Sequence, residues 1–345
     1  MNVFELPDFD GHEQVVFAND PKTGLKAVIA IHNTHRGPAM GGCRMWKYVD
    51  TQAAVTDALR LSRGMTYKNA MADLPIGGGK AVIIGDARTD KTPELMLAFG
   101  EAVERVAGRY ITAEDVGSSP ADMALVREKT RFVAGLGGEL GGRGDPSPAT
   151  ALGVFVGIGA AAKHRLGADS VAGMTVAVQG LGHVGYDLAR QLHAAGARLI
   201  VTDIHADNCQ RAAAEFGAKV VGPDEIYDVD AEVFAPCALG AIVNDKTASR
   251  FKFKIIAGAA NNQLATDALG EHLKSAGILY APDYVINAGG IIKVCAEYFK
   301  EPAEQVEGRV RKIADTLTEI FTSAASRGAN PASVADEMAR ARFSA

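Results

Sequence analysis

Short apolar runs rich in β-branched residues alternate along this chain with longer segments whose apolar residues recur at helical spacing. This pattern is typical of an α/β fold, in which buried strands alternate with amphipathic helices. Residue types that start helices, such as Thr92 before Pro93, mark several of the helical segments. The first half is predicted to contain strands at 25–32, 81–84 and 109–112, and helices from about Thr51, from Thr92 and from Ser119 to about Lys129.

Two glycine-rich stretches interrupt this pattern, at 37–42 and 77–79. The first is predicted to be a loop where the backbone comes close to another group, and the second a loop that leads into a strand. The second stretch ends at Lys80, which is therefore expected where a loop enters a sheet. Asp115 is expected at the exit of the strand 109–112.

The organising unit of the second half is a predicted strand, glycine turn, helix and second strand over 174–203. Its turn has the G-x-G-x-x-G arrangement, with Gly180, Gly182 and Gly185, and the second strand ends at Asp203. In a dinucleotide site these glycines permit a tight turn, a close approach to the pyrophosphate, and helix–strand contact, while the acid receives a ribose hydroxyl. A plain packing turn is the alternative. Asp203 disfavours the additional phosphate of NADP, so NAD is the predicted cofactor.

Four further strands are predicted near 219–221, 232–235, 254–257 and 278–280, and the segment from 304 onward is predicted to be helical. In a doubly wound sheet the turns after such strands surround the ligand. The glycine- and proline-rich segment 135–148 is the predicted domain boundary. We therefore predict an N-terminal α/β substrate domain (1–140), a doubly wound Rossmann-type NAD-binding domain (141–330), a cleft between them, and a final helix (331–345) that packs back on the first domain.

Composition narrows the class of protein. The 345 residues are 48% hydrophobic and 22% charged, as in an ordinary globular protein, and the net charge of −5 gives no case for nucleic acid or an anionic membrane as a partner. The four cysteines are far apart in sequence and the eight histidines lack metal-ligand spacing, so no metal site is expected. Without a signal-peptide pattern or a membrane-length apolar run, the chain is expected to be cytoplasmic.

Lys68, Lys80 and Asp115 are the informative charged residues of the first half, because they lie at element ends beside small residues. A surface lysine and a helix-capping aspartate are the plain alternatives. A lysine enclosed beside a second cation has its charged form disfavoured, which suits it to base catalysis. Together with a nucleotide domain, two lysines and an aspartate suggest amine chemistry.

Seven short motifs follow one another through nearly the whole chain: GPAMGG at 37–42, MTYKN at 65–69, GGGK at 77–80, TAEDVG at 112–117, APCALG at 235–240, AANNQ at 259–263 and PDYVINAGG at 282–290. In these motifs and their order the chain resembles the glutamate/leucine/phenylalanine/valine dehydrogenase family, and its leucine-acting branch most of all. The resemblance implies NAD-dependent, reversible oxidative deamination of an L-amino acid to a 2-oxo acid and ammonia by a homo-oligomer of two to eight subunits.

The resemblance also implies residue roles. Lys80 would activate the attacking water and Asp115 would exchange protons with the amino group. Lys68, with Asn262 and the backbone near Gly41, would bind the substrate carboxylate. The residues matching cofactor contacts are Arg44, Thr150, Gly180, Leu181, Gly182, His183, Val184, Gly185, Tyr186, Asp203, Ile204, Cys237, Ala238 and Asn261.

Four apolar residues match the side-chain pocket of the leucine enzymes: Met40, Ala113, Ile291 and Val294. An apolar pocket would leave a charged substrate side chain unpaired. Ala113 stands where aromatic-acting relatives tend to have glycine, which favours leucine, valine and isoleucine. A phenylalanine or tryptophan dehydrogenase is the alternative within the family, and a non-catalytic nucleotide-binding regulator is the alternative from another class. Cys43 and Gly79 depart from the usual threonine and alanine of the leucine enzymes.

Overall fold

The computed structural model describes residues 2–136 and 144–344 and divides the chain into two compact units. The first comprises Met1–Gly144, Val294–Glu301 and Ala339–Ala345, and the second comprises Asp145–Lys293 and Pro302–Met338. The predicted boundary between residues 140 and 141 lies outside the described residues and stays a prediction.

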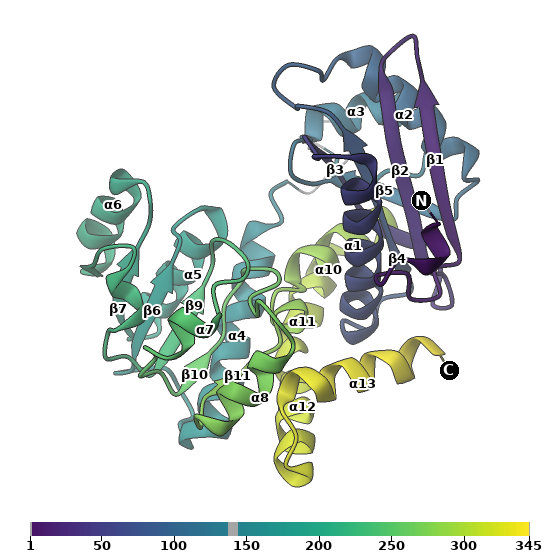
Figure 1. The fold of residues 1–345 in the computed structure, drawn as a ribbon. Helices are drawn as coiled ribbons and strands as arrows, with labels where there is room; N and C mark the ends of the chain where they lie inside the picture. Colours follow the sequence, from purple (N-terminus) through teal and green to yellow (C-terminus); the bar gives the residue numbers. More distant parts are fainter. Residues whose placement is uncertain (1, 137–143, 345) are drawn as a thin grey trace. The chain divides into compact units, whose positions relative to one another are not determined.

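The first unit is built on a five-stranded mixed sheet with the order β1-β2-β4-β3-β5 (Figure 1). β2 is antiparallel to β1 and β4, whereas β3 is parallel to both β4 and β5. The carboxyl ends of β3, β4 and β5 therefore lie at one edge of the sheet. The elements are η1 (Val3–Glu5), β1 (Gln14–Asp20), β2 (Leu25–Asn33), β3 (Ala39–Trp46), α1 (Thr51–Met71), β4 (Gly77–Ile84), α2 (Pro93–Arg105), β5 (Tyr110–Glu114) and α3 (Pro120–Lys129).

Helices cover both faces of this sheet, and the alternation of side chains along the strands decides which residues meet them. On one face Ile29 packs in a cluster with Phe99 of α2, and on the other Val28 and Val82 pack with Leu59 of α1. The predicted helix starts are confirmed, since Asp50, Thr92 and Ser119 cap α1, α2 and α3 through their side chains.

The prediction that the glycine-rich stretches form loops is wrong for 39–42 and 77–79, which lie in strands. The first stretch enters β3 at Ala39, and 77–79 is the start of β4. Close packing leaves no room for a side chain at these strand positions: a Cβ on Gly78 would lie 2.1 Å from the backbone nitrogen of Thr66 on α1, and a Cβ on Gly41 would lie 1.9 Å from the Gly79 carbonyl oxygen. Lys80 is consequently a residue of the strand itself and not of a loop that leads into it.

The second unit contains a six-stranded sheet with the order β11-β10-β9-β6-β7-β8, in which every pair is parallel. Counted within the unit this is the order 6-5-4-1-2-3, so the predicted doubly wound Rossmann-type fold is confirmed, with its switch point between β6 and β9. The strands are β6 (Thr175–Gln179), β7 (Arg198–Thr202), β8 (Lys219–Val220), β9 (Val233–Pro236), β10 (Ile255–Ile256) and β11 (Leu279–Tyr280).

Helices flank these strands and continue to the end of the chain, as the helical spacing from 304 onward predicted. Two of them, α10 and α13, contain residues of both units. The helices are α4 (Ser147–Leu166), α5 (His183–Ala194), α6 (Ala206–Phe216), η3 (Glu225–Tyr227), α7 (Asp245–Ala248), α8 (Ala268–Ser275), α9 (Asp283–Ile286), α10 (Gly289–Tyr298), α11 (Ala303–Arg311), α12 (Ile313–Arg327) and α13 (Pro331–Ser344).

The last turn of α13 belongs to the first unit and packs on the end of α1. The Phe343 ring lies 5.3 Å from the Tyr67 ring and 6.0 Å from the His32 ring, measured between centroids. Arg342 Nη1 donates a hydrogen bond of 3.1 Å to the carbonyl of Met71. The final residues of the chain therefore support the helix turn that carries Lys68.

Beneath Phe343, the buried rings of His12 and His32 lie 4.8 Å apart, and His32 Nδ1 is 2.8 Å from Thr66 Oγ1. Burial, and to a smaller extent the neighbouring His12, lowers the pKa of His32 to about 4. Below the ordinary histidine pKa of about 6.5 the unfolded chain binds a proton that the folded chain does not, so stability falls as pH falls from 6.5 toward 4.

We expect the wild-type protein to lose about 2 kcal/mol of unfolding free energy through His32 between pH 7 and pH 5. His32→Asn should be less stable at pH 7 but should show a smaller loss on acidification. Thermal melting at several pH values measures this, with exposed His205→Asn as the control variant. An identical pH slope for wild type and His32→Asn would contradict the prediction.

Candidate active site

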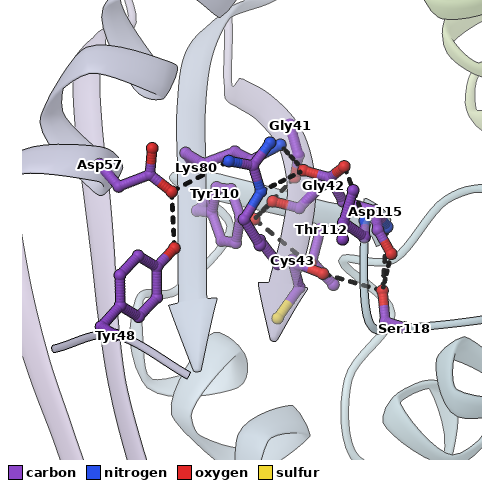
Figure 2. A network of polar contacts seen from close by, with 12 residues as sticks. Gly41, Gly42, Cys43, Tyr48, Asp57, Lys80, Tyr110, Thr112, Asp115 and Ser118 are labelled. Atoms are coloured by element: carbon purple, nitrogen blue, oxygen red, sulfur yellow. Dashed lines mark hydrogen bonds and ion pairs between the residues drawn. The ribbon is translucent and has the colours of Figure 1, made fainter. Parts of the chain in front are cut away.

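Lys80, Arg44 and Asp115 come together on the α1 face of the first unit's sheet. Lys80 has the same alternation as Val82, which packs against α1, and Asp115 directly follows β5. Lys80 is only 6% exposed, and its Nζ donates a hydrogen bond to Asp115 Oδ2 (Figure 2). The structure thus pairs the two residues for which proton-transfer roles were expected.

The charges around Asp115 keep its carboxylate ionised. Burial alone would raise its pKa, but the Lys80 ammonium, the Arg44 guanidinium and the N–H of Val116 together hold the pKa below its usual value. Arg44 Nε lies 3.7 Å from Asp115 Oδ2, and the Val116 N–H donates to Asp115 Oδ1 at 2.7 Å. The pair is therefore a buried ammonium and carboxylate, close enough to exchange a proton.

The hydrogen bonds behind this pair hold the strands that carry it. Ser118 Oγ accepts from the Asp115 N–H at 2.9 Å and donates to the Cys43 carbonyl at 2.8 Å (Figure 2). The Tyr110 hydroxyl, buried under β3, donates to the Gly41 carbonyl at 2.6 Å. The sequence did not predict this part for the two hydroxyls, because their bonds to the Cys43 and Gly41 carbonyls join segments distant in sequence.

The other predicted substrate residues of the first unit lie around the starts and ends of the same elements. Lys68 is half-buried in the last turn of α1, and its neighbour Asn69 ties that turn to β4 by donating to the Gly77 carbonyl at 2.7 Å. Met40 and Ala113 are buried on the neighbouring strands β3 and β5. These residues, with Gly41 and Arg44, share one small sheet and the helix on it.

In the second unit, the G-x-G-x-x-G turn has the geometry that its glycines predicted. Gly180 has φ +92°, a conformation that side chains disfavour. A Cβ on Gly185 would lie 2.0 Å from the Gly180 carbonyl oxygen, so this position is closed to side chains. Gly182 is the N-cap of α5, and a Cβ there would meet nothing within 4 Å. The helix N-terminus beside Gly182 is therefore open to an anion.

Asp203 is held at the end of β7 by backbone donors. Its Oδ2 accepts from the Leu181 N–H at 2.6 Å and its Oδ1 from the His205 N–H at 2.7 Å, while Ile204 beside it is 85% exposed. A cavity of about 470 Å³ opens next to the turn. It is lined by Asp145, Ser147, Pro148, Leu181, Gly182, His183, Tyr186, Asp187, Asn208 and Arg211. The cavity includes four of the predicted cofactor contacts but not Asp203 itself.

The remaining predicted contacts of the second unit follow the carboxyl ends of its strands. Cys237 and Ala238 come directly after β9, and a Cβ on Gly180 would touch Ala238 at 2.8 Å. After β10, the Asn261 side chain accepts from Asn287 Nδ2 at 2.8 Å, and Asn262 adopts the left-handed φ of +52°. Thr150 and Ile291 are half-buried on α4 and α10.

These features fit a pyridine nucleotide. The open helix N-terminus suits a pyrophosphate, and the cavity beside it is of the size that small-molecule ligands occupy. Buried oxygens of Gln179, Thr202 and Asn287 find no hydrogen-bond partner among the described residues. Such oxygens near the strand ends can accept bonds from a ligand.

Other kinds of site gain no support from the described residues. They contain no group of three or more histidine, cysteine, aspartate or glutamate residues that could hold a metal ion. All four cysteines are free thiols, and burial raises the pKa of Cys237 to about 12. No helix in the described part of the chain is long and apolar enough to cross a membrane.

The predicted site residues are divided between the two units. Lys68, Lys80, Asp115, Arg44, Met40, Gly41, Ala113 and Val294 belong to the first, and all the others belong to the second. Each set is gathered within its own unit. The cleft that would bring the two sets together stays a prediction.

Comparison with known proteins agrees with the geometry. The chain is 51% identical over 343 residues to the leucine dehydrogenase of Thermoactinomyces intermedius, covering 99% of this chain and 94% of the relative. It is 46% identical to the phenylalanine dehydrogenase of Caldalkalibacillus thermarum, over 99% of this chain and 94% of that relative. Among solved structures, the L-tryptophan dehydrogenase of Nostoc punctiforme superposes with a TM-score of 0.87 at 45% identity, covering 97% of this chain and 96% of the other.

The family descriptions match both units. "Glu/Leu/Phe/Val dehydrogenase, dimerisation domain" matches residues 12–132, and "Glutamate/Leucine/Phenylalanine/Valine dehydrogenase" matches 141–207 and 201–343. Enzymes of this kind depend on a pyridine nucleotide, which fits the turn and cavity of the second unit. With its paired Lys80 and Asp115 and its parallel nucleotide-binding sheet, the chain belongs to the glutamate/leucine/phenylalanine/valine dehydrogenase family and is an amino acid dehydrogenase.

Proposed function

We propose that this protein oxidatively deaminates branched-chain L-amino acids, namely leucine, valine and isoleucine, with NAD as the hydride acceptor. The observation that carries the proposal is the buried contact between Lys80 and Asp115, which supplies one base and one acid at a single point. The reaction converts the amino acid, water and the oxidised nucleotide into a 2-oxo acid, ammonium, the reduced nucleotide and a proton.

Two bonds of the substrate change in sequence, and each needs a proton carrier. Asp115 first accepts a proton from the substrate ammonium, which frees the electron pair of the amino nitrogen. NAD, when bound, would supply the acceptor for the hydride that leaves Cα as a double bond forms between Cα and this nitrogen. Lys80 then removes a proton from water as the water oxygen bonds to Cα, and Asp115 returns its proton to the nitrogen. The C–N bond breaks to release ammonia as the hydroxyl proton passes to Asp115 and the C=O bond forms. The contact between Lys80 and Asp115 allows the two residues to restore each other's protonation state.

Substrate binding is assigned to the residues around this pair. Lys68 would pair with the substrate carboxylate, with Asn262 and the backbone at Gly41 as further partners. An ammonium that binds a carboxylate fixes one end of the substrate and so orients Cα. The proposed side-chain pocket is apolar, because Met40 and Ala113 are buried hydrophobic residues. Ile291 and Val294, both half-buried on α10, are proposed to complete it.

The choice of NAD rests on Asp203. Its carboxylate is held at the end of β7 by two backbone N–H groups and so cannot easily turn away. A fixed negative charge at this position would repel the 2′-phosphate of NADP and accept hydrogen bonds from a free ribose hydroxyl. Arg211, which lines the cavity, stacks on the Tyr186 ring with its guanidinium carbon 3.7 Å from the ring centroid.

The test is a panel of L-amino acids assayed with NAD and with NADP. We expect kcat/KM for leucine, valine and isoleucine to exceed that for phenylalanine and tryptophan by about 10-fold or more, since pocket differences of methylene size are worth roughly 1–3 kcal/mol. NAD should be preferred over NADP. A preference for aromatic substrates would make the protein an aromatic amino acid dehydrogenase, the reading favoured by its likeness to the tryptophan and phenylalanine enzymes. The absence of turnover with any of them would favour a regulator.

We also propose that the protein works as a homo-oligomer. The support is the match of residues 12–132 to a domain described as a dimerisation domain. Light scattering on the purified protein measures the mass of the particle, and a single-subunit mass of 36.1 kDa would contradict the proposal.

A further inference from the structure

The polar network around the Lys80–Asp115 pair extends to two residues with no assigned role, Tyr48 and Asp57. Asp57 lies on α1, and Tyr48 lies in the connection between β3 and α1. Asp57 Oδ2 accepts from Arg44 Nη1 at 3.0 Å and from the Tyr48 hydroxyl at 2.6 Å. Figure 2 shows Tyr48 and Asp57 at one end of the network and Asp115 at the other. We refer to Tyr48 and Asp57 together as the Arg44 clamp.

The orientation of Arg44 requires such a restraint. Its Nη1 is bonded to Asp57, whereas its Nε faces Asp115 Oδ2 at 3.7 Å, beyond hydrogen-bond distance. Nε is buried, and no described residue accepts a hydrogen bond from it. A buried donor without an acceptor is unfavourable, so an unrestrained guanidinium would turn toward water or another acceptor. The bond to Asp57 opposes that movement.

A stationary cation at this point matters because of the charge that Lys80 loses. When Lys80 acts as a base it is a neutral amine, and its attraction for the Asp115 carboxylate disappears. Burial would then favour protonation of Asp115. Arginine stays charged throughout the working pH range, so Arg44 can keep Asp115 ionised, and able to accept a proton from the substrate, while the charge of Lys80 changes.

The clamp also connects this cation to the helix that carries Lys68. Asp57 and Lys68 are eleven residues apart on α1, which corresponds to about three turns, so both lie on the same side of the helix. Since the Asp57 side of α1 bonds a residue of β3, the sheet and helix are tied at one end by Arg44 and at the other by Asn69. A change at Asp57 therefore affects the packing of α1, the helix that carries Lys68, on the sheet.

We propose that Tyr48 and Asp57 are positioning residues that hold the Arg44 guanidinium beside Asp115 during the reaction. This inference rests on the proposed function, in which Lys80 and Asp115 carry the proton transfers. Neither clamp residue touches the reacting atoms; both act through Arg44. Burial, and to a smaller extent the hydrogen bond to Asp57, raises the pKa of Tyr48. The Tyr48 hydroxyl therefore keeps its proton and remains a hydrogen-bond donor.

The titratable groups around Asp115 come from each element packed near it: Lys80 from β4, Arg44 and Cys43 from β3, Tyr48 from the following connection, Asp57 from α1 and Tyr110 from β5. Among the described residues, Lys80 and Arg44 are the cations in contact with Asp115. The Cys43 thiol is neutral, because burial raises its pKa.

The pH profile of kcat/KM for oxidative deamination tests the clamp through the sign of a shift. The acid limb reports the coupled Lys80–Asp115 pair. Removing the Asp57 charge would, by Coulomb's law alone, favour the less protonated state of this pair and move the acid limb to lower pH. Release of Arg44 has the opposite effect, because the pair loses a neighbouring cation. We expect Asp57→Asn to move the acid limb up by about half to one pH unit and to lower kcat/KM about tenfold. Tyr48→Phe, which changes no charge, should move it in the same direction by a smaller amount.

A double-mutant cycle separates positioning from a general effect on folding. If Asp57 acts through Arg44, Asp57→Asn should change kcat/KM less than about twofold in an Arg44→Gln background. Asp50→Ala is the matched control, because it removes the cap of α1 without a contact to Arg44. It should lower the melting temperature and leave the acid limb in place.

The outcomes are distinct. The clamp is supported if Asp57→Asn shifts the acid limb to higher pH and if the effects of Asp57→Asn and Arg44→Gln on kcat/KM are not additive. An unchanged or downward acid limb in Asp57→Asn, or additive effects with Arg44→Gln, overturns it while wild-type activity still supports the proposed function. If Asp57→Asn fails to fold, an unchanged acid limb in Tyr48→Phe overturns the clamp. If the wild-type protein reduces no NAD with any amino acid, the proposed function has failed first.

Discussion

Lys80→Ala should lower kcat for oxidative deamination by about 10²- to 10⁴-fold, the usual range for loss of a general acid or base. The side chain is buried and bonded to Asp115, so its removal takes away both the proposed base and the main partner of that carboxylate. Steady-state kinetics with leucine and NAD measure the loss. The dissociation constant of the reduced nucleotide, measured by fluorescence titration, should change no more than about threefold, which corresponds to less than about 1 kcal/mol.

Two further variants make this result specific. Lys80→Gln keeps most of the side-chain volume but cannot act as a base, so it should lose activity to the same degree as Lys80→Ala. Lys22→Ala removes an exposed lysine from the connection between β1 and β2 and should retain wild-type rates. Wild-type turnover in Lys80→Gln would refute the role assigned to this residue.

Gly182→Ala and Gly185→Ala should separate nucleotide binding from folding. Gly182 has φ −67° and open space beside it, so alanine fits the backbone but places a methyl group where the pyrophosphate is expected. We expect nucleotide affinity to fall about 10- to 100-fold, or roughly 1.4–2.8 kcal/mol, with little change in melting temperature. At Gly185, a Cβ would lie 2.0 Å from the Gly180 carbonyl, and overpacking of this kind costs about 1–3 kcal/mol of stability or more.

The measurements are nucleotide titration and thermal melting of each variant. Gly185→Ala should melt several degrees lower, since about 1 kcal/mol corresponds to roughly 2–4 °C in a domain of 150–250 residues. Gly159→Ala in α4 is a control, because a Cβ there also meets nothing within 4 Å and the position is not a predicted cofactor contact. If Gly182→Ala binds the nucleotide as tightly as the wild type, the pyrophosphate does not lie at this turn.

Local signals in the sequence were enough for much of the fold. The caps at Thr92 and Ser119 predicted helix starts correctly, because a capping side chain bonds a backbone N–H only three residues away. The turn at Gly180 was recognisable for the same reason, since the positive φ of Gly180 and the contact of Gly185 with the Gly180 carbonyl are constraints within a few residues. The parallel strands of the second unit were found from short apolar runs, which buried strands need regardless of their partners.

The loops expected at 37–42 and 77–79 show where such reasoning fails. Glycine favours turns when only neighbouring residues are considered, but Gly78 lies at a strand position where the backbone of Thr66, twelve residues earlier, leaves no room for a Cβ. The clamp was missed for a similar reason. Asp57 has the sequence context of a solvent-facing helix residue, and only the packing of α1 on β3 brings it to Arg44.

The sequence by itself determined the alternation of strands and helices, the nucleotide turn and the residue types available for chemistry, because each depends on interactions within a few residues. The tertiary structure alone decided which of those residues meet. Lys80 and Asp115 are 35 positions apart, and their contact exists because β4 and β5 both flank β3 with parallel directions. Distances of that kind depend on sheet order and on the alternation of side chains across strands, which no local pattern records.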